Sequence, residues 1–408
     1  EMNGAAIDQE LAHVFSNLPC HGPFQENALL VHLDGGASLG NLSAYSFKRG
    51  KLEVVECNWD LSYLSKFYND NALNFSLLNH RPEEHCAVPG KLMGFATMGT
   101  PKEEILVWLM ENDWFKTCWE DKSIFYQRAW QTFKWKGRLG DTRDTFLQDV
   151  AATFQRKFEQ DWIEYLQKIQ EKVKADYLYL SGGCALNIVA NTRIVNSGMF
   201  KNVFIPPCPG DSGLSIGAAA FLKWKKHGKV ELVSPYLNNV GLSPAQNDFS
   251  EELVTQVAKI IADGGVVGVA NGFAEAGPRA LGNRSILARP DSLDITRHVS
   301  MQCKKREWYR PVAPVMLEKN AKRFTGLSSI DPLSQFMLLD FKIPEENRPE
   351  IIGVVHKNGT ARLQTIFNSS QHPFLWGLLS HLDQDYNIPG LINTSFNVRG
   401  EPIVHTPN

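Results

Sequence analysis

The chain has 408 residues, 43% of them hydrophobic and 21% charged, and a formal net charge of −2 at pH 7; this is the composition of an ordinary globular protein that is long enough for two domains. The slight acidity gives no reason to expect a nucleic-acid partner, and no apolar run approaches membrane-spanning length. The seven cysteines are scattered and form no CxxC pair, which indicates reduced thiols in the cytoplasm and argues against a zinc ribbon or a disulfide scaffold.

Glycine-rich turns punctuate the first half of the chain. The apolar run 28–31 leads into DGGAS at 34–38, and later turns are GKLMGFATMG at 90–99, YLSGGCALN at 179–187 and PPCPGDSGLSIGAAA at 206–220. Each is predicted to follow a short strand, and several are predicted to begin a helix. A strand that delivers glycine amides at a helix N-terminus forms an anion-binding site. One such turn is usually only a turn, but several in order are stronger evidence.

A long amphipathic helix is predicted between the second and third turns. Apolar residues recur at three- and four-residue steps over 147–173, with Thr145 or Asp144 near the N-cap, and a strand is expected at 177–180. The aromatic-rich stretch 114–135 is either core or an acceptor-facing lid. Core is the preferred interpretation, because aromatic residues at helical spacing usually pack inside.

A domain boundary is predicted at 229–249, which is rich in Pro, Asn and Ser. The expected domains are residues 1–235 and 248–408. Downstream of the boundary, a helix is predicted at 251–262 and a strand at 265–270.

Five fixed positive charges then fall in a stretch that otherwise reads as buried: Arg279, Arg284, Lys304, Arg306 and Arg310. Guanidinium groups bind phosphate or carboxylate with paired hydrogen bonds, and lysine adds a compact charge. The cluster predicts a pocket for a highly charged anion such as ATP or an acyl phosphate. The alternative is a set of buried arginines that pair with Glu275 and Glu307.

Two short spacings carry a family resemblance. Lys304 and Arg306 form Lys-x-Arg, and Ser395 and Asn397 form Ser-x-Asn, a pair that resembles the nucleotide site of YrdC-like domains, which make acyl-adenylates from ATP. The longer strings GPRALGNRS, KKREWYRP and NTSFN resemble the C-terminal domain of the O-carbamoyltransferases that modify nodulation factors, cephamycins, tobramycin and ansamycins. The glycine-rich turns resemble the actin-like, sugar-kinase-like ATPase fold. The expected fold is therefore α/β, with an actin-like domain followed by a YrdC-like domain.

The resemblance implies an ATP-dependent O-carbamoyltransferase. Carbamoyl phosphate and ATP, with Mg²⁺, would form carbamoyl-adenylate in the second domain, and the first domain would transfer the carbamoyl group to a hydroxyl of a small molecule or sugar. By motif match, the adenylate site takes Lys304, Arg306, Ser395 and Asn397. Arg279 and Arg284 are expected to bind carbamoyl phosphate or the triphosphate of ATP. The nucleotide is also expected to meet Gly182, Gly183 and Asn187.

The resemblance also implies a divalent metal, iron, in the first domain. The family binds it with an HxxxH pair on one helical turn and two aspartates. His13 matches the second histidine, and Asp34 and Asp211 match the aspartates, whereas Gln9 stands at the first histidine position. Glutamine is a poor substitute for imidazole toward a transition metal. The implied centre therefore has three matching ligands.

Other functions stay open beside this one. The chain is expected to be truncated at its N-terminus relative to the family, and no general base can be chosen among His32, His85 and His405. A threonylcarbamoyl or hydrogenase-maturation enzyme of the same superfamily is one alternative, although no CxxC pair supports the latter. A non-catalytic or degenerate nucleotide-binding subunit is the other. The expected partners are carbamoyl phosphate and a hydroxyl acceptor, without nucleic acid or membrane, and a homodimer is one open assembly.

Overall fold

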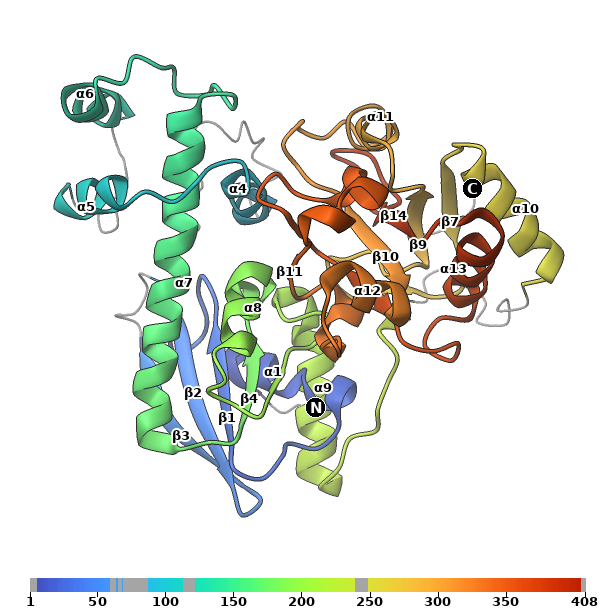
Figure 1. Ribbon diagram of the computed structural model, residues 1–408. Coiled ribbons are helices and arrows are strands. Elements are labelled where there is room, and N and C mark those ends of the chain that lie inside the picture. The colour runs from blue at the N-terminus through green and yellow to red at the C-terminus, as the bar shows by residue number, and fades with distance from the viewer. Residues whose placement is uncertain are drawn as a thin grey trace. The chain divides into compact units, whose positions relative to one another are not determined.

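A computed structural model describes residues 6–58, 64, 68, 87–112, 122–238 and 249–404. The chain forms two compact units, Glu1–Leu232 and Val233–Asn408 (Figure 1). Each unit contains a five-stranded mixed sheet accompanied by helices, so the predicted α/β class is confirmed. Within the described ranges, no helix combines the length and apolar character that a bilayer crossing requires.

The sheet of the first unit has the strand order β3-β2-β1-β4-β5. Its strands are β1 (Ala28–Leu33), β2 (Leu42–Lys48), β3 (Lys51–Asn58), β4 (Tyr177–Ser181) and β5 (Asn202–Phe204). β1 is parallel to β4, and His32 pairs with Ser181 near the ends of the two strands. Because parallel strands end at the same edge of a sheet, the turns after β1 and β4 lie beside each other. The candidate site of the first unit lies at this edge.

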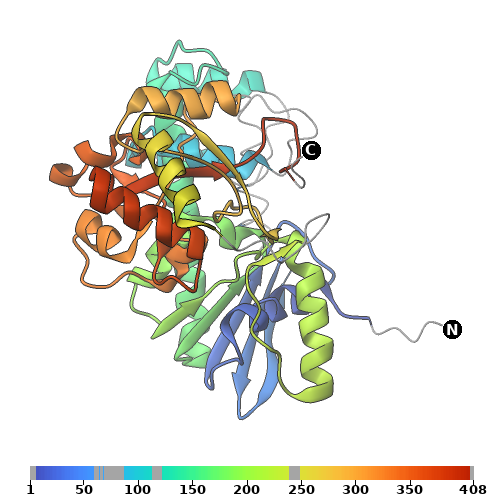
Figure 2. The same ribbon diagram turned by 90° about the vertical axis from the view of Figure 1, so that its right-hand side faces the viewer.

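The first unit holds the helices α1 (Gln9–Phe15), α2 (Leu18–His21), α4 (Val88–Ala96), α5 (Glu103–Glu111), α6 (Lys122–Phe133), α7 (Thr145–Val173), α8 (Ile188–Asn196) and α9 (Leu214–His227), with the 3-10 turns η3 (Gly183–Leu186) and η4 (Asp211–Gly213). Figures 1 and 2 show α9, in yellow-green, beside the strands. Phe15 of α1 packs edge-on against Phe221 of α9 in a core shared with the sheet. A Cβ on Gly217 would lie 1.7 Å from the carbonyl oxygen of Ala12, so α1 and α9 meet at backbone contact. That contact fixes the position of α1.

The predicted long helix is confirmed as α7. Its N-cap is Asp144, whose Oδ1 accepts a hydrogen bond from the Leu147 amide at 3.1 Å. At the other end, Nζ of Lys48 donates to the Val173 carbonyl at 2.7 Å, which ties α7 to β2. The strand predicted at 177–180 is confirmed as β4, one residue longer.

The predicted glycine-rich turn at 90–99 is wrong. Gly90 and Gly94 lie inside α4, whose first turn begins with Val88 and Pro89. Proline at this position suits a helix start, and packing of buried residues against α7 outweighs the poor helix propensity of glycine.

Part of the aromatic stretch 114–135 falls at residues 113–121, outside the described residues. In the part that is described, Phe125 and Trp135 are buried, and Trp108 packs against Phe125 with ring centroids 5.3 Å apart. The preference for core packing is confirmed for these two residues and is wrong for Tyr126 and Trp130, whose side chains are exposed.

The sheet of the second unit has the order β13-β10-β14-β9-β7. Its strands are β7 (Val267–Ala270), β9 (Arg284–Ala288), β10 (Ala313–Leu317), β13 (Gln364–Ile366) and β14 (Gly390–Ser395). β14 lies between β9 and β10 and is antiparallel to both. The strand predicted at 265–270 is present but begins at Val267.

Two helices, α10 (Glu251–Ala262) and α13 (Pro373–Tyr386), lie side by side and pack on this sheet through a cluster that includes Leu287, Val315 and Leu391 (Figure 1). The helix predicted at 251–262 is thus confirmed. The remaining elements of the unit are β6 (Tyr236–Asn238), β8 (Ala274–Glu275), α11 (Leu293–Arg297), the π-helical turn η5 (His298–Cys303), α12 (Glu318–Thr325), η6 (Pro332–Phe336), β11 (Phe341–Lys342), η7 (Glu345–Asn347), η8 (Pro349–Val354) and β12 (Thr360–Ala361).

Candidate functional sites

Lys304, in the second unit, follows η5 and is only 1% exposed. Its Nζ donates to the carbonyl oxygen and Oδ1 of Asn397 at 2.7 and 2.8 Å, to Oγ of Ser395 at 3.1 Å, and to the Ser395 carbonyl. Arg306 reaches the same Ser395 hydroxyl at 3.4 Å. Between them, Lys305 adopts the left-handed conformation at φ 51°. The structure therefore brings together the four residues of the Lys-x-Arg and Ser-x-Asn motifs.

Other arginines lie close enough to this group to disfavour one another's charge. Burial and the nearby Arg310 lower the pKa of Arg279 to about 10 and that of Arg306 to about 9. Burial, Arg306 and Arg310 lower the pKa of Lys304 to about 7. The pKa of Arg362 is also lowered well below its ordinary value, by burial and by Arg279, Arg306 and Arg310. Mutually repelling buried cations are typical of a site for an anion.

The alternative, in which the buried arginines pair with Glu275 and Glu307, is confirmed only for Glu307. Glu307 lies 3.6 Å from Arg310 and 3.3 Å from Arg399, measured between carboxylate oxygen and guanidinium nitrogen. Glu275 instead accepts hydrogen bonds from the backbone amides of Leu281 and Asn283, at 2.7 and 2.8 Å. One carboxylate therefore pairs within the cluster, and the other shapes the loop that carries Arg279.

Arg284 is 1% exposed and is surrounded by main-chain carbonyls. Its guanidinium donates to the carbonyl oxygens of Asn271 and Asn283 at 2.8 Å, and to those of Gly272 and Val404 at 3.0 Å. These bonds give Arg284 a structural role in joining three segments. Its expected contact with a phosphorylated ligand stays a prediction.

Sequence reasoning missed Arg362 and Arg399. Arg362 stands between β12 and β13, outside any recognisable motif, and joins the cluster because β13 pairs with β10. Arg399 lies two residues beyond Asn397, and its backbone amide donates to the Lys304 carbonyl at 3.1 Å. Its position next to the Ser-x-Asn motif is a sequence signal from which Arg399 could have been predicted as a member of the cluster.

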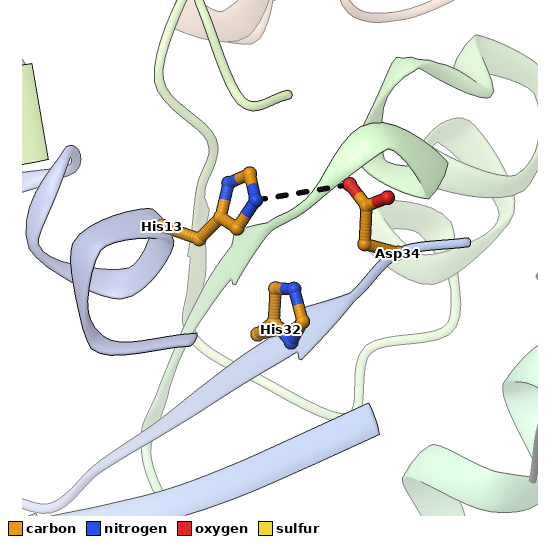
Figure 3. Close-up of side chains that lie close together, drawn as sticks. All are labelled: His13, His32 and Asp34. Carbon is orange, nitrogen blue, oxygen red and sulfur yellow. Dashed lines mark ion pairs between the residues drawn. The ribbon is translucent and has the colours of Figure 1, made fainter. Parts of the chain in front are cut away.

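A second group of polar side chains lies in the first unit, at the edge where β1 and β4 end. His13 and His32 point toward Asp34 in Figure 3, with His13 on α1 and His32 on β1. Nε2 of His13 lies 3.8 Å from Oδ2 of Asp34 and 3.4 Å from Oδ1 of Asp211. The rings of His13 and His32 stack with centroids 4.8 Å apart. His13 thus faces both expected carboxylate ligands, Asp34 and Asp211, and His32 forms a close cluster with His13 and Asp34.

The tautomer of the neutral His13 ring follows from the hydrogen bond of its other nitrogen. Nδ1 lies 2.9 Å from the Pro209 carbonyl, which can only accept, so Nδ1 carries a hydrogen. In the neutral ring, Nε2 then presents its lone pair to two carboxylates. Nε2 has no hydrogen-bond partner among the described residues, and a metal ion between these groups would accept its lone pair.

Burial is the main cause of the pKa shifts of the neighbouring Asp34 and His32. It raises the pKa of Asp34, although hydrogen bonding to the Gly183 amide and the nearby His13 act in the opposite direction. It lowers the pKa of His32 to about 3, with His13 as a further cause, so His32 is neutral at physiological pH. Neither ring nitrogen of His32 has a hydrogen-bond partner among the described residues. An unsatisfied buried polar group costs about 1–3 kcal/mol.

These donors fit a divalent transition metal. One ligand atom each from His13, His32 and Asp34 lies within 4.8 Å of the others. With metal–ligand bonds of ~2.1 Å, the edge of a tetrahedral site is roughly 3.4 Å, close to the spacings between His13 and the two aspartates. Imidazole with carboxylate suits iron or zinc better than magnesium or calcium. Gln9 does not offer its oxygen here, because its Nε2 donates to Oδ1 of Asp211 at 3.2 Å.

The glycines after β4 hold Asp34 in place. The Gly183 amide donates to Oδ2 of Asp34, and the Gly182 amide donates to the Pro209 carbonyl at 2.8 Å. Asn187 caps α8 by accepting from the Ala190 amide at 3.1 Å, and its side-chain amide pairs with Gln155. The expected nucleotide contacts of Gly182, Gly183 and Asn187 stay predictions, because the donors described here serve the fold. His85 and His405 lie outside the described residues.

Comparison with known proteins places both halves of the chain in one family. Residues 6–220 match the family model of the carbamoyltransferase N-terminus, and residues 258–408 match that of the carbamoyltransferase C-terminus. The chain is 33% identical to nodulation protein NolNO of Sinorhizobium fredii, over 98% of this chain and 60% of that protein. It is 36% identical to nodulation protein U of Azorhizobium caulinodans, over 62% of this chain and 45% of that protein. The chain thus spans about half of the length of these relatives.

Among solved structures, full-length HypF in its phosphate- and nucleotide-bound form matches 55% of this chain and 36% of its own, with 12% identity and a TM-score of 0.31. A likeness this low supports no inference.

Proposed function

The chain belongs to the carbamoyltransferase family, and from that premise we propose that it is an ATP-dependent O-carbamoyltransferase whose second unit forms carbamoyl-adenylate and whose first unit transfers the carbamoyl group. In this proposal the first unit is actin-like and the second is YrdC-like. The observation that carries it is the meeting of Lys304 and Arg306 with Ser395 and Asn397 inside a cluster of arginines.

The proposed reaction has three balanced steps. Carbamoyl phosphate and water give carbamate and phosphate; carbamate and ATP give carbamoyl-AMP and pyrophosphate; carbamoyl-AMP and an acceptor alcohol give the carbamate ester and AMP. Phosphate oxygens gain or redistribute negative charge in the first two steps. Lys304, Arg306 and Arg279 would neutralise that charge, which is the main contribution a protein makes to such transfers. Ser395 and Asn397 would orient the Lys304 ammonium, with Mg²⁺ accompanying ATP.

The third step belongs to the first unit in this proposal. His13, Asp34 and Asp211 would hold a divalent metal, expected to be iron, which when bound acts as a Lewis acid on a carbonyl oxygen. The Pro209 carbonyl keeps the His13 lone pair on Nε2. The Gly183 amide keeps Asp34 oriented toward His13. These residues therefore supply a prearranged donor set, independent of the acceptor's identity.

Isotope exchange between pyrophosphate and ATP tests the adenylation step. Exchange that depends on carbamoyl phosphate and disappears in Arg306→Ala is the expected result. Exchange without carbamoyl phosphate, or full exchange in Arg306→Ala, would contradict the assignment. A panel of hydroxylated sugars and small molecules, scored for carbamate ester by mass spectrometry, then identifies the acceptor class.

A nucleotide-binding subunit without transfer activity is the second candidate. It is favoured by Gln9, whose amide lies against Asp211 where an imidazole was expected. Metal analysis of the purified chain separates the two candidates. ATP binding without iron or zinc would support the subunit, and one bound metal per chain would support the transferase.

A further inference from the structure

We infer that His32, on strand β1, is a direct ligand of the metal ion in the first unit, alongside His13, Asp34 and Asp211. The inference rests on the metal centre of the proposed function and deepens it, because it adds a second imidazole that the motif resemblance did not assign. It leaves the adenylation chemistry of the second unit untouched.

The placement of His32 follows from strand geometry. His32 lies on β1, and Asp34 follows β1 two residues later. Residues two apart on an extended chain project from the same face. Both side chains therefore reach the side of the sheet on which α1 presents His13, as Figure 3 shows.

His32 is fully buried, and neither of its ring nitrogens has a hydrogen-bond partner among the described residues. Other buried histidines differ in this respect. Nδ1 of His13 contacts the Pro209 carbonyl, Nδ1 of His356 contacts Oγ1 of Thr360 at 3.1 Å, and Nδ1 of His372 accepts from the Leu375 amide at 3.2 Å. A packing role alone would leave both nitrogens of His32 without compensation. A lone pair directed at a metal supplies that compensation.

The distances allow coordination after a small adjustment. Ligand atoms of His13, His32 and Asp34 lie within 4.8 Å of one another, compared with edges of roughly 3.4 Å in a tetrahedral site with bonds of ~2.1 Å. Coordination would therefore draw these donor atoms closer together than they lie in the metal-free chain. Two imidazoles and two carboxylates would neutralise a divalent cation, and this N₂O₂ set suits Fe²⁺, Co²⁺ or Zn²⁺.

Titration of the full chain with Co²⁺ tests the inference, because the visible absorption of Co²⁺ reports its ligands. The variant is His32→Ala, with His13→Ala as the positive control. His21→Ala is the matched control, since His21 is a histidine of the same unit whose Nε2 contacts the Ile205 carbonyl at 2.8 Å. We expect His32→Ala to weaken Co²⁺ binding roughly tenfold to hundredfold or more and to change the absorption band. His21→Ala is expected to keep the wild-type affinity and band.

Each other outcome is decisive. Wild-type affinity and an unchanged band in His32→Ala would overturn the inference. Weaker binding with an unchanged band would also overturn it, since His32 would then only position the other ligands. If the wild-type chain bound no Co²⁺, both the centre and the inference would fail, while pyrophosphate exchange would still report on the second unit.

Folding is checked by thermal unfolding of the metal-free variants. His32→Gln, which keeps a similar volume and a polar group, replaces His32→Ala if the alanine variant does not fold. The rise in melting temperature on adding Co²⁺ should be smaller in either variant than in the wild type. An equal rise would count against His32 as a ligand.

Discussion

Lys304 and Asn397 are 93 residues apart in the chain, yet Nζ of the lysine lies 2.8 Å from Oδ1 of the asparagine. The side chain of Lys304 is held in place by oxygens of Ser395 and Asn397. We expect Lys304→Met to reduce carbamoyl-phosphate-dependent pyrophosphate exchange by about 10²–10³-fold, the usual effect of losing one stabilising charge. Lys322→Met is the control, because Lys322 pairs with Glu318 on α12. Comparable losses in both variants would contradict a specific role for Lys304.

The lowered pKa of Lys304 predicts proton uptake when ATP binds. Burial and the neighbouring Arg306 and Arg310 bring this pKa to about 7, so the free protein at pH 8 holds Lys304 mostly neutral. A bound polyphosphate favours the ammonium and raises the pKa, so binding takes up a proton and affinity falls as pH rises above about 7. Calorimetry in buffers of different ionisation enthalpy measures the uptake. Lys304→Met should abolish it, and equal uptake in this variant would assign it to another group.

Removing one arginine from the cluster should stabilise the protein and weaken anion binding together. Arg362 is repelled by Arg279, Arg306 and Arg310. We expect Arg362→Met to raise the melting temperature in the absence of ligand by about 2–4 °C for each kcal/mol of relieved repulsion. The further rise on adding pyrophosphate should shrink.

Arg323→Met provides the comparison for this prediction, because Arg323 forms an exposed pair with Glu350 that contributes little stability. A lower melting temperature for Arg362→Met, with pyrophosphate stabilisation intact, would identify the arginines as structural.

The backbone contact between α1 and α9 predicts a coupled loss of stability and metal affinity. A methyl group at Gly217 would meet the Ala12 carbonyl, so Gly217→Ala must displace α1 together with His13. Such overpacking costs about 1–3 kcal/mol. Thermal unfolding and Co²⁺ titration should both show the loss, whereas pyrophosphate exchange, a reaction of the second unit, should persist.

Lys226→Ala is the matched substitution on α9, since Lys226 is exposed. If Gly217→Ala bound Co²⁺ as the wild type does, helix placement would not control the metal centre.

Helices with strong local signals could be predicted from sequence. Residues 147–173 repeat apolar positions at helical spacing, and Asp144 supplies the cap that the structure contains. The segment 90–99 could not be predicted in this way. Its glycines favour a turn locally, whereas buried packing of α4 against α7, which is set by distant residues, selects a helix.

The same contrast between local signals and distant contacts applies to the residues of the candidate sites. Lys304 and Ser395 were placed together by motif, because each motif is short and contiguous. Arg362 was missed because it reaches the cluster through the pairing of β13 with β10. His32 appeared only as one of several histidines, since strand alternation cannot say which buried imidazole lacks a hydrogen-bond partner.

Two of the oxygens that hold Lys304 are the main-chain carbonyls of Ser395 and Asn397. Because these acceptors belong to the main chain, a substitution at either position leaves them in place as long as the backbone of β14 is unchanged. Substitutions at positions 395 and 397 should therefore be tolerated better than substitutions at position 304. Relatives with other residues at 395 and 397 can still hold a lysine in the same place. A search for this site by side-chain identity alone would overlook such proteins, whereas a search by backbone path would find them.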